Sequence, residues 1–320
     1  MIPYLDLHCD TLEIGFLKKK EDIFEFPEGM LDIRRMREAG MFGQFFAMFF
    51  PPKEREWMPE DEVYYQSLKK LFYDSLEKHS ECIAFAGNGR TAEENFRQGK
   101  LSAFLTMEDG RHVQGKLENI RRFYDDGVRL ITLTWNYENC FGAPNSREVS
   151  IMQKGLTDFG KEAVGYMNGL GMLIDVSHLS DGGFYDVAEL SKKPFVASHS
   201  NARALSPHPR NLTDDMLRKL AQCGGLAGVN FYGAFLQKDA ATEKSTVEAL
   251  AAHIRYMTNI GGEDCVALGT DFDGICGELE IGNPLQMELL FDRLKRDGFS
   301  ERQIEKFAYR NALRVLHDVL

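Results

Sequence analysis

Two residues near the start of the chain, His8 and Asp10, have the types and the spacing of a metal-binding pair. They are two positions apart at the end of a short apolar segment, so an extended strand turns both side chains to one face and Cys9 to the other. Imidazole nitrogens and carboxylate oxygens are ligands suited to zinc and similar cations. Taken alone the pair is weak evidence, because a core histidine beside a surface aspartate is the ordinary alternative.

Three further candidate ligands, Glu108, His178 and His199, also follow apolar segments. Burial of an unpaired carboxylate such as Glu108 would cost several kcal/mol, and a metal ion would offset that cost. The alternative for Glu108 is a solvated turn residue. For the two histidines it is a hydrogen-bonded core or rim position.

Asp271 lies in the glycine-containing turn Thr270-Asp271-Phe272-Asp273-Gly274, where a carboxylate can face a cleft as a metal ligand or a proton shuttle. Its neighbour Asp273 could simply be a residue that forms the turn, without a role in chemistry.

Two other residues are candidates for contact with a substrate. Arg210 could hold a substrate carboxylate, or it could pair with Asp214 and Asp215 at the start of the next predicted helix. Trp135 follows an apolar segment and could form a pocket wall or simply pack. His112 and His208 lie in predicted loops near these residues and receive no role.

The elements that would position these side chains alternate between short apolar segments and segments of helical period. This pattern predicts an α/β fold, a (β/α)8 barrel of the metal-dependent hydrolase type, and an open doubly wound sheet is the alternative. We expect two extra C-terminal helices, at 300–308 and 309–319, and an insertion-like loop at 51–60. The predicted strands are 4–8, 42–49, 101–107, 129–134, 172–176, 194–198, 226–230 and 265–270. The predicted helices are 30–39, 60–79, 116–126, 155–170, 181–191, 213–223, 245–260 and 285–296.

Because the C-terminal ends of barrel strands meet at one rim, the barrel would bring all of the candidate ligands together. This convergence is the strongest functional signal in the sequence.

Composition narrows the class of protein further. The 320 residues are 43% hydrophobic and 27% charged, which is typical of a globular chain, and we expect one domain over residues 1–320. A formal charge of -11 disfavours nucleic acid and anionic membranes as partners. Six scattered cysteines indicate reduced thiols, and the start of the chain lacks the pattern of a signal peptide, so we expect a cytoplasmic protein.

With these residues in view, the chain resembles the membrane (renal) dipeptidase family of metallopeptidases, as a bacterial-type member. The matching segments run in family order from residue 6 to residue 316, which makes the resemblance specific. They include Asp6-Leu7-His8-Cys9-Asp10, Met107-Glu108-Asp109-Gly110, Ile174-Asp175-Val176-Ser177-His178, Ala197-Ser198-His199-Ser200, Arg210-Asn211, Val229-Asn230-Phe231-Tyr232 and Gly269-Thr270-Asp271-Phe272-Asp273-Gly274.

The resemblance implies a dipeptidase with two zinc ions, often accepting a D-residue at the C-terminal position of its substrate. His8 and Asp10 would hold one ion, His178 and His199 the other, and Glu108 would bridge them. A hydroxide between the ions would attack the peptide carbonyl. Asp271 would carry the proton to the leaving amine. Arg210 would bind the substrate carboxylate, Tyr232 and Gly274 would line the site, and a homodimer is a family-level expectation.

One position departs from the family pattern. Where the animal enzymes carry a histidine that stabilises the oxyanion, this chain has Trp135. Indole donates one hydrogen bond but carries no positive charge. Related bacterial-type sequences also have Trp-Asn here, so we interpret Trp135 as a subfamily trait. The rival hypotheses are an amidohydrolase of another small amide or lactone, and a catalytically silent barrel.

Overall fold

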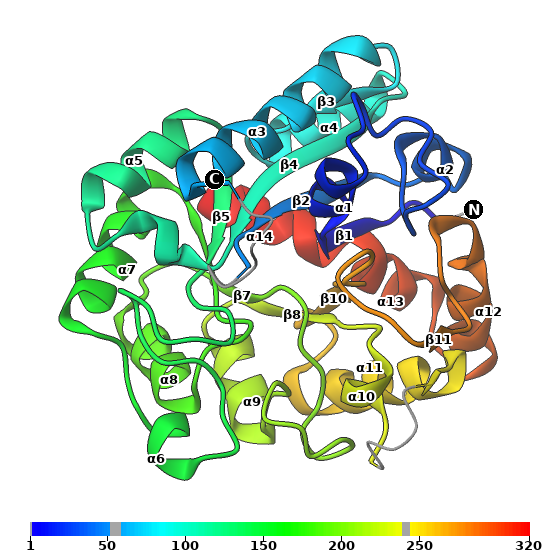
Figure 1. The fold of residues 1–320 in the computed structure, drawn as a ribbon. Helices are drawn as coiled ribbons and strands as arrows, with labels where there is room; N and C mark the ends of the chain where they lie inside the picture. The colour runs from blue at the N-terminus through cyan, green and yellow to red at the C-terminus, as the bar shows by residue number, and fades with distance from the viewer. Residues whose placement is uncertain (1, 52–58, 239–243) are drawn as a thin grey trace.

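A closed ring of parallel strands forms the centre of the molecule in the computed structural model, which describes residues 2–51, 59–238 and 244–320 (Figure 1). Eight strands complete the ring, because β2 pairs with both β1 and β4, and β1 pairs with β10. The predicted barrel is therefore confirmed, and the open-sheet alternative is wrong. The ring consists of β1 (Leu5–Cys9), β2 (Gly43–Phe49), β4 (Leu101–Glu108), β5 (Val128–Thr132), β6 (Leu173–Asp175), β7 (Val196–Ala197), β8 (Leu226–Val229) and β10 (Val266–Leu268).

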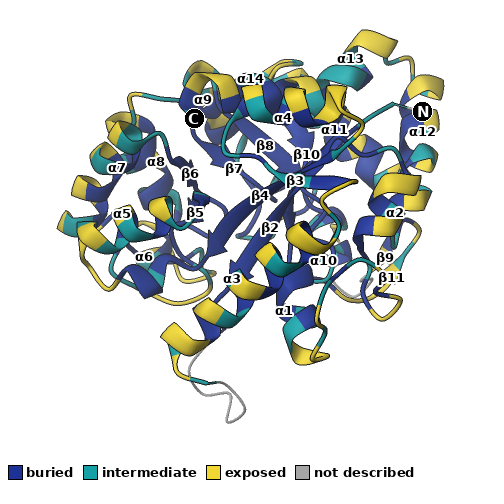
Figure 2. Ribbon diagram, turned by 90° about the horizontal axis from the view of Figure 1, so that it is seen from above, coloured by how far each residue is buried: buried dark blue, intermediate teal, exposed yellow. Residues whose placement is uncertain are grey.

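Helices surround this ring, with buried faces toward the strands and exposed faces outward (Figure 2). Each helix predicted from the apolar periodicity has a counterpart, with bounds that differ by a few residues. None of the helices in the described ranges is long and apolar enough to cross a membrane. They are α1 (Thr11–Leu17), α2 (Ile33–Glu38), α3 (Asp61–Lys78), α4 (Gly89–Arg97), α5 (Leu117–Asp125), α6 (Val149–Met152), α7 (Asp158–Leu170), α8 (Asp181–Leu190), α9 (Asp214–Gln222), α10 (Gly233–Leu236), α11 (Val247–Gly261), α12 (Glu288–Arg296), α13 (Glu301–Glu305) and α14 (Asn311–Val319).

Several elements were not predicted, chiefly β3 (Ile83–Phe85) and the helix α4 that follows it. The strand has three residues and pairs with the first residues of β4 outside the ring, so it shows no apolar run of useful length. Helix α4 is mostly polar. The helices α1, α6 and α10 and the strands β9 (Lys244–Ser245) and β11 (Glu278–Leu279) are short and were missed as well. The loop expected at 51–60 has residues 52–58 outside the described ranges.

The two predicted C-terminal helices are one continuous helix, and the prediction of a break at residue 309 is wrong. Ser300 caps its start in a capping box with Gln303. A π-helical turn at Lys306–Arg310 joins α13 to α14. The chain contains no glycine or proline between 301 and 319 that would end a helix, so nothing local requires a break.

Helix α14 closes the end of the barrel opposite to the carboxyl ends of the strands, and Figure 1 shows it crossing behind the ring. Asn311 donates to the carbonyl of Val266, the first residue of β10. The apolar cluster that α14 shares with the barrel includes the first residues of four strands, namely Leu5, Leu173, Val196 and Leu226. This end is therefore a packed apolar floor, and the opposite rim is left for the polar residues.

Close approach of strands β7, β8 and β10 depends on glycine. A Cβ added at Gly269 would overlap the carbonyl oxygen of Ser198, and the same holds at Gly228.

We expect Gly269→Ala to lower the free energy of unfolding by about 1–3 kcal/mol, measured by urea denaturation. The control is Gly165→Ala on α7, where no neighbouring atom lies within 4 Å. There the gain in helix propensity should raise stability by about 0.5–1 kcal/mol. Equal responses of the two variants would refute this account of the close approach.

Candidate metal centre

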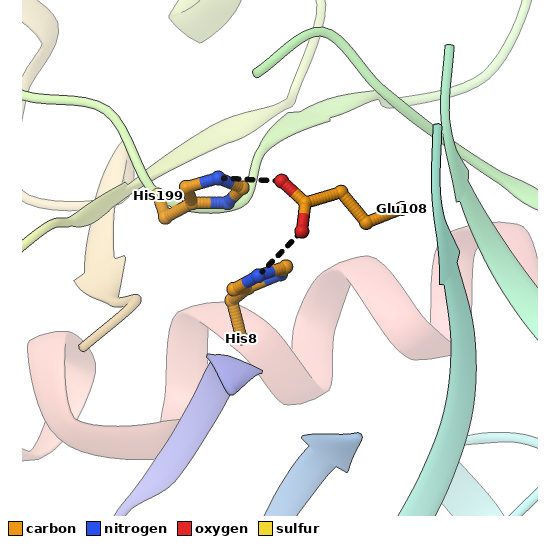
Figure 3. A group of neighbouring side chains, drawn as sticks. All are labelled: His8, Glu108 and His199. Atoms are coloured by element: carbon orange, nitrogen blue, oxygen red, sulfur yellow. Dashed lines mark ion pairs between the residues drawn. The ribbon is translucent and has the colours of Figure 1, made fainter. Parts of the chain in front are cut away.

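The carboxylate of Glu108 joins side chains from widely separated parts of the chain (Figure 3). Glu108 ends β4, His8 lies in β1, and His199 follows β7. Glu108 Oε2 lies 3.4 Å from His8 Nε2, and its Oε1 lies 3.6 Å from His199 Nε2. His178, which follows β6, places its Nε2 3.0 Å from the same Oε1. Each oxygen of Glu108 thus faces a different set of ring nitrogens.

Two carboxylates complete the group on the side of His8. Asp10 Oδ2 lies 3.3 Å from His8 Nε2, and Asp271 Oδ1 lies 3.7 Å from it. The structure therefore gathers two overlapping sets of possible ligands, His8 with Glu108 and His199, and His8 with Asp10 and Asp271. All five ligands predicted from the strand ends converge here. Asp271 lies close enough to be a sixth ligand as well as a proton shuttle.

Buried atoms in this group fit a bound cation. Within the described ranges, His8 Nε2 and Asp10 Oδ1 are buried without a hydrogen-bond partner. The Nε2 atoms of His178 and His199 approach each other to 3.1 Å, and the rings of His8 and His199 stack with centroids 3.9 Å apart. Buried polar groups are normally paired, so unsatisfied nitrogens and oxygens that face a common centre suit a divalent metal.

The electrostatics of the cluster favour neutral histidines on one side of Glu108. Burial, aided by the charge of Arg210, lowers the pKa of His178 to about 4. Burial also lowers the pKa of His199 well below its usual value. Neutral imidazole is the form that binds a metal. Each of these two histidines therefore has one ring nitrogen with a lone pair at neutral pH.

The carboxylates around His8 repel one another. Burial raises the pKa of Asp271 to about 8, with the charges of Asp10 and Glu108 adding to the rise. Burial and the charge of Glu108 raise the pKa of Asp10 to about 6. Burial alone would raise the pKa of Glu108, but His8 and His178 hold it well below its usual range. A cation placed among these groups would relieve the repulsion.

The backbone at the barrel rim adopts unusual conformations where these ligands stand. His178 and Asp271 have positive φ angles of 66° and 63°. Such left-handed conformations are uncommon outside glycine, and they cluster at functional sites. Gly274 is required for a different reason: a Cβ there would overlap Asp10 Oδ2 and lie 2.5 Å from Asp271 Oδ1.

A cavity of about 300 Å³ opens above the ligands. Trp135, Tyr232 and Gly274, which the sequence placed near a substrate, all line it. Trp135 packs edge-on against Phe49 with ring centroids 4.9 Å apart. The other lining residues are Asp10, Glu13, Glu108, Asn136, His178, Phe235, Asp271, Asp273, Ile275 and Cys276.

Arg210 is buried behind this cavity rather than in its wall. Its guanidinium donates to Ser200 Oγ at 2.9 Å and to the His199 carbonyl at 3.1 Å, and it lies over the ring of Phe235, which does line the cavity. The alternative partner Asp214 instead accepts from Tyr256.

Some residues of the site were missed in the sequence. Asn230 donates from Nδ2 to Asp271 Oδ2 at 2.8 Å, and Asn136 Oδ1 lies 3.0 Å from His178 Nδ1. Asn230 directly follows β8, so the strand-end rule that found the ligands could have found it. Asn136 lies in a loop four residues beyond β5, directly after Trp135, and from the sequence it received no role of its own beyond a place beside that predicted pocket wall.

The two unassigned histidines belong to packing networks near the rim. His112 stacks on Phe50 and pairs with Glu62 at 3.3 Å. His208 Nδ1 accepts from the backbone N–H of Arg210, which supports the loop that carries Arg210.

Comparison with known proteins gives one consistent family. A family model described as membrane dipeptidase (peptidase family M19) matches residues 1–320. The uncharacterized protein in the pqqA 5' region of Klebsiella pneumoniae is 38% identical over 259 residues, covering 79% of this chain and 93% of that protein. The uncharacterized dipeptidase C965.12 of Schizosaccharomyces pombe is 32% identical over 309 residues, covering 91% of this chain and 73% of that protein.

A solved structure extends the similarity to the whole fold. The metallo peptidase from Rhodobacter sphaeroides, liganded with a phosphinate mimic of the dipeptide L-Ala-D-Ala, superposes with a TM-score of 0.88 at 26% identity. The match covers 100% of this chain and 99% of that chain.

The position of Gly274 yields a prediction for metal binding. Gly274→Ala should displace Asp10 and Asp271 and weaken binding of zinc by about 10–100-fold, measured by competition with a chromophoric chelator. Gly282→Ala serves as the control, because its nearest neighbouring atom would lie 3.8 Å from the new Cβ. Unchanged zinc affinity in Gly274→Ala would show that Asp10 is not a ligand.

Proposed function

Because the chain belongs to the membrane dipeptidase family of metallopeptidases (peptidase family M19), we propose that this site cleaves the peptide bond of free dipeptides, including those with a D-residue at the C-terminal position. The observation that carries the proposal is the convergence of His8, Asp10, Glu108, His178 and His199 at the floor of one small cavity.

Two divalent cations, with zinc the best match to nitrogen and carboxylate ligands, would occupy the ligand group. His8 and Asp10 would hold one and His178 and His199 the other, with Glu108 between them. When bound, such ions polarise a carbonyl and lower the pKa of a water molecule.

Asp271 is the residue proposed to move the proton. Its Oδ2 accepts from Asn230, which fixes the carboxylate, and its Oδ1 is directed toward His8. As the oxygen of water forms a bond to the peptide carbon, Asp271 takes the proton. It then delivers the proton to the amide nitrogen while the carbon–nitrogen bond breaks, and a free amine leaves.

The size and charge of the cavity favour a short substrate with a free carboxylate. Its volume of about 300 Å³ suits a dipeptide better than a longer chain. Arg210 would attract the C-terminal carboxylate from behind Phe235: burial lowers its pKa to about 10, which still leaves it charged at neutral pH. Tolerance of a D-residue rests on similarity to the Rhodobacter relative, whose ligand mimics L-Ala-D-Ala.

Trp135 favours a second candidate, hydrolysis of another small amide or lactone. Together with Phe49 it makes an aromatic wall that presents no positive charge. The two candidates differ in their need for a substrate carboxylate.

The first test combines metal content with substrate preference. We expect the purified protein to bind two equivalents of zinc and to hydrolyse L-Ala-D-Ala and L-Ala-L-Ala. Hydrolysis is measured by the release of alanine. Amidation of the C-terminal carboxylate should remove most of the activity, because the charged partner of Arg210 is lost. Less than one equivalent of zinc with no hydrolysis after zinc addition would overturn the proposal. Equal activity on amidated substrates would favour the second candidate.

The second test concerns Asp271. Asp271→Asn should keep the metal content while lowering kcat by about two or more orders of magnitude, because an amide cannot accept the proton. Asp264→Asn makes the same chemical change at an exposed carboxylate and should leave kcat unaltered. Loss of zinc from Asp271→Asn would instead identify Asp271 as a ligand, and unchanged kcat would exclude both roles.

A further inference from the structure

His178 and His199 share a feature that the proposed function does not use: each directs Nδ1 away from the cluster to an uncharged partner. His178 Nδ1 lies 3.0 Å from Asn136 Oδ1, and His199 Nδ1 lies 2.7 Å from Ser198 Oγ. The opposite nitrogens, Nε2, both face Glu108 Oε1. In both rings one nitrogen is tied to the protein and the other is presented to the cluster.

The proton on His199 can be placed by following the hydrogen bonds. The single proton of Ser198 Oγ is donated to Asp175 Oδ2 at 2.6 Å, a charged acceptor. Asp175 is fixed in turn by the backbone N–H groups of Ser177 and Ser198, each 2.9 Å from its Oδ1. Ser198 Oγ therefore offers only a lone pair to His199, so Nδ1 of His199 carries the hydrogen.

The same logic applies to His178 through a different residue. The carbonyl oxygen of Asn136 can only accept, so Nδ1 of His178 donates to it, and in the neutral ring Nε2 keeps its lone pair. His8 differs, because in the described part of the chain neither of its ring nitrogens has a hydrogen-bond partner.

We propose that Asn136 and Ser198 are positioning residues that hold His178 and His199 in the tautomer with hydrogen on Nδ1, and so reserve both Nε2 lone pairs for one of the two cations. The inference rests on the metal centre of the proposed function. Its consequence is an asymmetry: the cation held by His178 and His199 depends on these two residues, whereas the cation held by His8 and Asp10 does not.

A titration of the metal-free, full-length protein with Co²⁺ alone tests this asymmetry without reference to activity. Binding is followed by calorimetry and by the visible absorption of bound Co²⁺. The wild-type chain should bind two equivalents. Asn136→Leu and Ser198→Ala should each weaken one equivalent by about 10–100-fold and leave the other unchanged.

Two variants separate positioning from mere packing. Asn136→Asp keeps an acceptor for His178 Nδ1 and should restore the weakened equivalent. Asn145→Leu is the matched control, because the side-chain Nδ2 of Asn145 donates to the backbone carbonyl of His178 at 3.0 Å and not to its ring. It should leave both equivalents intact. Asn136 is exposed at the cavity, so its variants are expected to fold even if Ser198→Ala does not.

The outcomes distinguish this inference from the function on which it rests. Two normal equivalents in Asn136→Leu, equal weakening of both equivalents, or failure of Asn136→Asp to restore binding would overturn the positioning role alone. Less than one equivalent on the wild-type chain would overturn the metal centre itself.

Discussion

Crowding of three buried carboxylates around one imidazole is the constraint on which the rest of the site depends. Asp10, Glu108 and Asp271 all lie within 3.7 Å of His8 Nε2, in surroundings that exclude most water. Carboxylates gathered around one atom in this way strongly disfavour joint ionisation. The arrangement is stable as a set of ionised groups only with positive charge among them. Burial would lower the pKa of His8, but Glu108 and Asp10 raise it well above its usual value, so a proton on His8 can supply this charge and a bound metal ion would take its place. The glycine at 274 and the left-handed backbone of Asp271 permit the crowding.

Closure of the barrel is what makes this crowding possible. The proposed ligands come from the end of β1, from β4 and from the segments after β6 and β7, and the segment after β10 adds Asp271, so residues 8 to 271 of the chain contribute. In an open sheet the ends of these strands would be spread along one edge, whereas the ring directs them to a common centre. The apolar floor built with α14 lies at the other end of the strands. The apolar packing and the candidate ligands thus lie at opposite ends of the barrel.

The same division explains what the sequence could predict. The apolar segments that form the barrel strands can be recognised in the sequence. The rule that polar residues follow such segments located His8, Glu108, His178 and His199. The rule fails for β3, which lies outside the ring, and it gives no role to Asn136, which lies in the loop after β5. It also cannot reveal the positive φ of His178 or the proton arrangement at Ser198, because both depend on neighbours from other strands. The false break at residue 309 has a different cause: the π-helical turn at Lys306–Arg310 shifts the phase of the helical pattern, although no breaker residue lies there.

The geometry also separates the part of the site that would perform hydrolysis from the part that would select a substrate. The ligand cluster lies at the cavity floor, while Phe49 and Trp135 form a packed aromatic pair in its wall. A neutral indole cannot supply the charge that a protonated histidine would give to a developing oxyanion. In the proposed reaction that stabilisation of the oxyanion must then come from the metal centre. Trp135 would instead influence which substrates fit the cavity, through the shape of its wall. Substitutions along this wall can therefore change the substrate without disturbing the ligands, which is how one barrel supports several related hydrolases.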